Sequence, residues 1–174
     1  MDIYKRESSI DSLKSDNSAF MWFQLFVEVL LRMNQSLTSI NELIDLCQKG
    51  NYEESNEIIQ EFKNEYNSKK SLWWYTRDSF VYKILNRALR TQNLRILIVF
   101  RFLIKDIYEE LKQEQEKQKT NDHMIFYRGQ GITKDELNKI KSNINEFISM
   151  RSFLSATTDF NVAKAFAQCS KNII

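Results

Sequence analysis

Two short segments of the sequence carry side chains that suit a ligand rich in phosphate and hydroxyl oxygens. In the first, Arg128 closes an apolar run just before Gly129 and Gly131. A guanidinium can hold phosphate or ribose oxygens through a fork of donors, and glycines let a ligand approach the backbone. In the second, Ser155 and Thr157 place two hydroxyls on one face of an alternating segment. The chemistry that these residues predict is anion and sugar binding.

The elements that must position these residues follow from local patterns between residues 121 and 174. The run His-Met-Ile-Phe-Tyr-Arg-Gly-Gln-Gly predicts a strand that ends in a tight turn. A helix should begin at Thr133, because Thr133 and Glu136 have the spacing of a capping box. Alternation of Phe153, Ser155 and Thr157 predicts a second strand. The stripe formed by Val162, Ala163 and Phe166 then predicts a closing helix, so the order is strand, helix, strand, helix.

A helical region is expected before this part, over residues 19–120, after a polar and flexible start over residues 1–18. Proline is absent and glycine occurs three times, so little interrupts the chain. Apolar spacing predicts helices over residues 20–30, 37–48 and 52–66. A helical hairpin should follow over 72–90 and 94–111, with these side chains on its buried stripes: Trp73, Phe80, Ile84, Ala88, Ile98, Phe102 and Ile104. The predicted fold class is therefore α+β and mostly α.

Together, the segments Phe126-Tyr127-Arg128-Gly129 and Ser152-Phe153-Leu154-Ser155-Ala156-Thr157 resemble two parts of the signature of arginine-specific, NAD(P)-dependent mono-ADP-ribosyltransferases. In that family an Arg ends one strand, a Ser-Thr-Ser lies on the next, and a Glu-x-Glu or Gln-x-Glu loop follows. The upstream stretches FMWFQLFVEVLLR and WWYTRDSFVYKILNRALRT are similar to the helical region that precedes the core in such proteins, notably those of rotifers. The resemblance covers about residues 19–168.

The resemblance implies that NAD, or alternatively NADP, is the cosubstrate and that a protein arginine accepts the ADP-ribose. It assigns cosubstrate binding to Tyr127, Arg128, Gly129, Ser155 and Thr157. Tyr127 and Phe160 are further candidates to flank the nicotinamide ring. The sequence departs from the family pattern at Ala156, where a hydroxyl is lost.

The carboxylate that this chemistry needs is not found in the sequence. Cleavage of the bond between ribose and nicotinamide passes through a cation-like sugar centre, which a nearby carboxylate stabilises. After Ser155 the only acidic residue is Asp159, and no Glu follows Glu146. We therefore expect a fragment that stops before the Glu-x-Glu segment, with no catalytic residue of its own and no transferase activity.

Several alternatives remain open at this point. Arg128 could pair with a nearby carboxylate, Thr157 could cap the following helix, and Tyr127 and Phe160 could be core residues. A glycohydrolase acting on NAD would share the same residues. The chain as a whole could instead be a noncatalytic helical module that binds a protein partner and carries a remnant transferase lobe.

Composition excludes other classes. A net charge of +2 lacks the basic excess of a nucleic-acid-binding protein. Cys47 and Cys169 stand outside any metal-ligand spacing, and the single His123 rules out a Ser-His-Asp arrangement within the chain. The apolar stretches are too short to span a bilayer, and the charged start has no apolar segment typical of a secretory signal. We expect a cytoplasmic protein without a metal site and without membrane or nucleic-acid partners.

Overall fold

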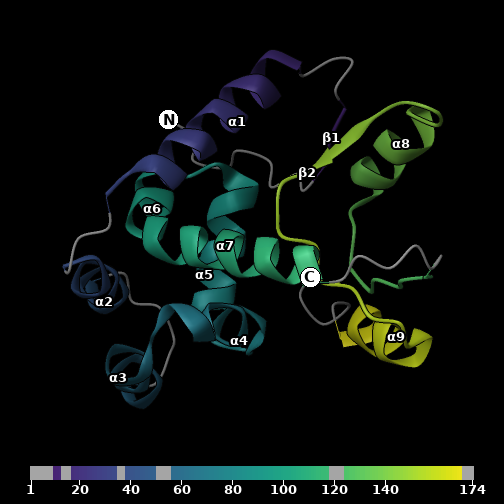
Figure 1. The fold of residues 1–174 in the computed structure, drawn as a ribbon. Helices are drawn as coiled ribbons and strands as arrows, with labels where there is room; N and C mark the ends of the chain where they lie inside the picture. The colour runs from purple at the N-terminus through teal and green to yellow at the C-terminus, as the bar shows by residue number, and fades with distance from the viewer. Residues whose placement is uncertain (1–9, 13–16, 35–37, 50–55, 118–123, 170–174) are drawn as a thin grey trace. The chain divides into compact units, whose positions relative to one another are not determined.

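The computed structural model describes residues 10–12, 17–34, 38–49, 56–117 and 124–169. Helices predominate among these residues (Figure 1). The chain divides into two compact units, a helical unit formed by residues 1–7 and 21–119, and a second unit formed by residues 8–20 and 120–174. Sequence analysis placed a boundary at residue 120, next to this division, but it did not group any of residues 8–20 with the C-terminal part.

The helical unit contains α1 from residue 21 onward and the elements up to Lys117. Apolar periodicity predicted helices near 20–30, 37–48 and 52–66, and α1, α2 and α3 confirm them within the described residues. Tyr52 and Leu37, where two of the predicted helices begin, lie outside those residues. The elements are α1 (Asn17–Arg32), α2 (Ser39–Lys49), α3 (Asn56–Glu65), the 3-10 turn η1 (Ser68–Lys70), α4 (Ser71–Thr76), α5 (Phe80–Thr91), α6 (Leu94–Val99) and α7 (Arg101–Lys117).

The predicted helical hairpin is present in outline, but each of its arms is divided. The first arm breaks at Arg77–Ser79, where Arg77 has an extended backbone and Ser79 precedes α5 with φ −149° and ψ 172°. The second arm breaks at Phe100, between α6 and α7. Gln92 turns the chain with a left-handed backbone, and the Asn93 side chain then caps α6 by accepting from the Ile96 amide. Because the chain reverses at Gln92, α5 packs on α6 and α4 packs on α7, as the two arms of a hairpin do.

The core of the helical unit is built from aromatic and aliphatic side chains of helices α1 to α7. Phe62 is at its centre, with ring centroids 4.9 Å from Trp74 and 5.6 Å from Phe80, both in edge-to-face geometry. The buried stripe therefore includes Trp74, whereas the predicted Trp73 is 49% exposed and Ile98 is 39% exposed. The largest fully buried side chains are Trp74, Phe62, Phe80, Phe100, Leu30, Leu43, Leu85, Leu97, Leu103, Ile107 and Val81.

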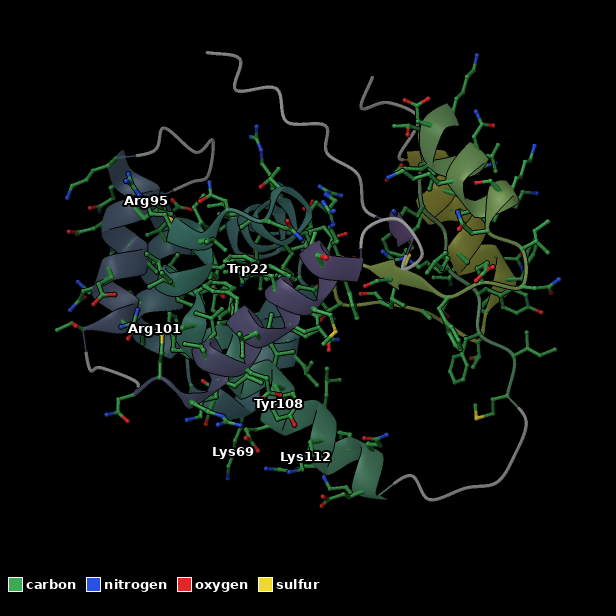
Figure 2. All side chains as sticks on the ribbon, turned by 90° about the horizontal axis from the view of Figure 1, so that it is seen from above. Trp22, Lys69, Arg95, Arg101, Tyr108 and Lys112 are labelled. Carbon is green, nitrogen blue, oxygen red and sulfur yellow. The ribbon has the colours of Figure 1, made fainter. Side chains whose placement is uncertain are left out.

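Polar ties join α7 to the elements around it. The Tyr66 hydroxyl donates to Asp106 Oδ2 at 2.6 Å, and burial together with this bond raises the pKa of Tyr66. Glu110 accepts from the Ser71 hydroxyl at 2.6 Å and from the Leu72 amide at 3.2 Å, which fixes the start of α4 against α7. Arg101, within the helical unit in Figure 2, reaches α2.

The second unit contains the strands β1 (Ile10–Ser12) and β2 (Ile148–Met150) and the helices α8 (Lys134–Ser142) and α9 (Phe160–Cys169). The two strands pair antiparallel, with Ile10 opposite Met150. Sequence analysis did not predict β1, because it lies in a polar start that was expected to be flexible. The helix after Thr133 is confirmed, including the reciprocal bonds of its capping box, and so is the closing helix.

Helix α1 and the second unit expose many apolar side chains. Trp22, labelled on α1 in Figure 2, is 51% exposed, and at least half of the surface of Met21, Leu25 and Val29 is exposed as well. In the second unit Ala163 is the only buried hydrophobic residue among the described ones. None of the helices in the described ranges is both long enough and apolar enough to cross a membrane.

Candidate functional site

The two motif segments meet at a single backbone pair in the second unit. The Tyr127 amide donates to the Thr157 carbonyl at 2.7 Å, and the Thr157 amide donates to the Tyr127 carbonyl at 2.9 Å. This antiparallel bridge is isolated. Of the strands predicted over residues 123–129 and 153–157, the described residues therefore show one bridge residue each, Tyr127 and Thr157.

Arg128 lies directly beside this bridge and reaches across it. Its Nη1 donates to the main-chain carbonyl of Ser155 at 2.7 Å, and its Nε donates to Oε1 of Gln130 at 2.9 Å. Both acceptors are neutral. Within the described residues no carboxylate forms an ion pair with Arg128, so the alternative that it pairs with a nearby acid has no support there. The exposed guanidinium is therefore held in place by two neutral oxygens, which leave its positive charge uncompensated.

Gly129 faces helix α9 rather than an open space for a ligand. A Cβ atom built on Gly129 would lie 1.7 Å from the Ala163 carbonyl oxygen and 2.7 Å from the Ala167 amide nitrogen. No side chain fits there, so this glycine lets the Arg128 segment pack against the backbone of α9. Its predicted role in approach of a ligand is replaced by a role in placing the helix behind the site.

The two hydroxyls of the second motif have different surroundings. Thr157 Oγ1 accepts from the Asp159 amide at 3.1 Å, and Asp159 Oδ1 accepts from the Asn161 amide at 2.7 Å. Asp159, which precedes Phe160, thus caps α9, whereas Thr157 accepts only from the amide of this cap residue and does not cap the helix itself. The Ser155 side chain is exposed, and its hydroxyl has no hydrogen-bond partner among the described residues. Ser155 is thus the hydroxyl that remains available to a ligand.

The aromatic pair expected to flank a nicotinamide ring does not leave room for one. The Tyr127 and Phe160 rings contact each other edge to face, with centroids 5.5 Å apart and planes inclined by 76°. A ring inserted between two others needs about 7 Å between parallel planes, twice the usual carbon contact distance. The two rings pack on one another, and Phe160 is 57% exposed.

The acidic side chains close to these elements serve as helix caps. Glu136 is 6% exposed and its Oε2 accepts from the Thr133 amide at 2.9 Å. Asp159 is held by the start of α9, as described above. No group of acidic, histidine or cysteine side chains that could hold a metal is present in the described part of the chain.

The structure brings together all five predicted binding residues, Tyr127, Arg128, Gly129, Ser155 and Thr157. It adds Gln130, which sequence analysis did not select. The only signal for Gln130 was its position two residues after Arg128, within the Arg-Gly-Gln-Gly turn.

Comparison with known proteins identifies no relative of this chain. No protein-family model matches the chain, and no curated protein and no solved structure is significantly similar to it.

Proposed function

We propose that the chain carries the NAD-binding part of a mono-ADP-ribosyltransferase directed at protein arginine. In this proposal Arg128 holds the pyrophosphate or ribose oxygens of NAD and Ser155 orients the ribose next to nicotinamide. NADP, which shares the pyrophosphate, is the alternative cosubstrate. The proposal rests on the resemblance of the two motifs to this family and on one observation, the placement of Arg128.

That observation is an exposed guanidinium held by two neutral oxygens at the point where the motif segments meet. A carboxylate next to an exposed arginine would lower the local positive potential. Among the described residues Arg128 has no such carboxylate and no hydrogen bond from Nη2, and its Nη1 contacts the carbonyl of Ser155. Charge-assisted bonds from a fixed guanidinium are among the stronger ways to recognise a pyrophosphate.

Transfer of ADP-ribose requires a further group. Of the acidic residues after Ser155, the sequence contains only Asp159, and its Oδ1 is engaged by the Asn161 amide. We therefore assign binding, and not transfer, to these 174 residues. Release of nicotinamide would need a glutamate on the C-terminal side of Ser155, and no Glu follows Glu146 in these residues.

The proposal is tested by a calorimetric titration of the chain with NAD, beside Arg128→Ala. Lys164→Ala is the matched control, because Lys164 is an exposed cation on α9 and its loss changes the net charge equally. We expect saturable binding by the wild type and the control, and loss of binding with Arg128→Ala. Equal binding by all three proteins, or binding by none, contradicts the proposal.

A second candidate function is a noncatalytic interaction module. It is favoured by the apolar side chains that α1 presents at the surface, among them Trp22 at 51% and Leu25 at 64% exposure. Clustered exposed apolar side chains are typical of protein contact sites. For this function Trp22→Ser would weaken capture of a protein partner, whereas Arg128→Ala would leave the capture unchanged.

A further inference from the structure

Gln130 contacts the side chain on which the proposed function depends. Its Oε1 accepts from Arg128 Nε at 2.9 Å, while the Ser155 carbonyl accepts from Arg128 Nη1 at 2.7 Å. The two oxygens accept hydrogen bonds from different nitrogens of one planar group. Two such points fix the guanidinium in its plane, which one hydrogen bond alone could not do.

The consequence for a ligand is that part of the ordering of Arg128 has already occurred. An exposed arginine samples many rotamers, and binding must overcome the entropy lost when one of them is selected. Arg128 is exposed, yet its guanidinium is tied to its own turn and to the neighbouring segment. The amide of Gln130 achieves this without adding a negative charge next to the anion site.

We infer that Gln130 is the positioning residue for Arg128, and that its neutral side chain strengthens binding of a pyrophosphate-bearing dinucleotide at this site. The inference rests on the proposed function, because it assigns the anion to Arg128. Gln130 itself need not touch the ligand. It acts by holding the guanidinium and by leaving its charge uncompensated.

Two substitutions of Gln130 separate the positioning of the guanidinium from the preservation of its charge. Gln130→Glu keeps the length of the side chain and an acceptor for Nε, but it places a carboxylate against the guanidinium. Gln130→Ala removes the acceptor and adds no charge. An exposed ion pair weakens an anion site modestly, so we expect Gln130→Glu to lower affinity by about threefold to fivefold at neutral pH.

The two variants should also differ in their dependence on pH. A glutamate carboxyl has an ordinary pKa of about 4.3, and a neighbouring guanidinium lowers it. As the pH falls through this lowered value the introduced carboxylate becomes neutral and resembles the amide again. Affinity of Gln130→Glu should therefore recover toward the wild type only as the pH falls below about 4, whereas Gln130→Ala stays weaker by a constant factor. A residue that only stabilises the fold would not produce this recovery.

The experiment is calorimetric NAD titration of the wild type, Gln130→Glu, Gln130→Ala and Arg128→Ala at several values from about pH 3 to about pH 7.5. Asn138→Asp, which adds the same charge on an exposed position of α8, is the matched control, and melting curves establish that each variant folds. Weak binding by Gln130→Glu that recovers in acid, with an unchanged control, is the expected result. Equal affinity of Gln130→Glu and wild type at neutral pH, or no recovery in acid, overturns the role of Gln130.

Failure of the proposed function gives a different pattern. If the wild type does not bind NAD, or if Arg128→Ala binds as the wild type does, both the proposed function and the role of Gln130 are wrong. If Gln130→Glu does not fold, Gln130→Ala decides the question, and wild-type affinity in that variant overturns the inference.

Discussion

Arg101 of α7 donates from Nη1 to Glu42 Oε2 of α2 at 3.0 Å, across 59 residues of sequence. The same guanidinium also donates to the buried Ser39 hydroxyl at 3.1 Å and to the Ile98 carbonyl at 2.8 Å. The Arg101 side chain is only 9% exposed, whereas Glu42 is 43% exposed. The pair thus ties two helices together at the edge of the core.

Arg101→Met should destabilise the helical unit, because it leaves Ser39 and the Ile98 carbonyl without this donor. Since Glu42 is partly solvated, we expect a loss of about 1–2 kcal/mol in the free energy of unfolding. The measurement is urea denaturation followed by far-UV circular dichroism. Arg95→Met is the control, because Arg95 is exposed on the neighbouring α6 (Figure 2) and should change stability by less than about 0.5 kcal/mol. Equal effects of the two substitutions would contradict this account.

Acid should weaken the helical unit through two of its ion pairs, Arg101–Glu42 and Arg77–Glu61. The hydrogen bond from Arg101 lowers the pKa of Glu42, and the hydrogen bond from Arg77 lowers the pKa of Glu61. A carboxyl whose pKa is lower in the folded state stabilises the fold above its ordinary pKa of about 4.3, and this contribution is lost as the pH falls through the lower folded value. The urea concentration at the unfolding midpoint should therefore fall as the pH is lowered below about 4.3, and it should fall less steeply in Glu42→Gln. Parallel pH curves for Glu42→Gln and the wild type would show that the Arg101 contact does not contribute.

Two fully buried serines of the helical unit should respond oppositely to removal of their hydroxyls. Ser71 donates to Glu110 at 2.6 Å, so Ser71→Ala should cost about 1–2 kcal/mol. The Ser79 hydroxyl is buried without a hydrogen-bond partner and does not cap α5, so Ser79→Ala should be neutral or raise the melting temperature. The comparison of the two melting temperatures is its own control. A large loss from Ser79→Ala would mean that its hydroxyl is satisfied in solution.

Much of the local structure could be predicted from the sequence because its causes are local. The capping box of Thr133 and Glu136 involves residues three positions apart, and it forms as predicted. The breaks at Arg77–Ser79 and Phe100 were missed, since no glycine or proline marks them and apolar spacing continues through both. The first arm is divided into α4 and α5, and α4 packs against α7. No local sequence pattern encodes this packing.

The candidate site was predictable in its residue types but not in its contacts. Arg128 and Ser155 were selected from their motifs, and they do lie together. That Gly129 faces α9 could not be read from the sequence, because a glycine before a turn suits a ligand or a helix equally well. Gln130 was overlooked because glutamine in a turn is usually a solvated residue, and its value here depends on a neighbour two positions away.

Gly129→Ala should loosen α9. The added methyl group would lie 1.7 Å from the Ala163 carbonyl oxygen, so the helix must move away from the Arg128 segment. We expect a cost of about 1–3 kcal/mol, seen as faster hydrogen exchange of the α9 amides. Ala165→Ser, on an exposed position of the same helix, is the control and should leave exchange unchanged. Unchanged exchange in Gly129→Ala would show that α9 does not pack on this glycine.

The central claim is that Arg128 binds the anion of NAD, and the Nε–H signal of Arg128 in the nitrogen-15 NMR spectrum of the chain tests it most directly. The signal is assigned by its loss in Arg128→Ala, and the Nε–H signal of Arg101 in the helical unit is the internal reference. The account predicts that addition of NAD shifts the Arg128 signal saturably and leaves the Arg101 signal in place. A folded chain in which saturating NAD leaves the Arg128 signal unmoved would contradict it.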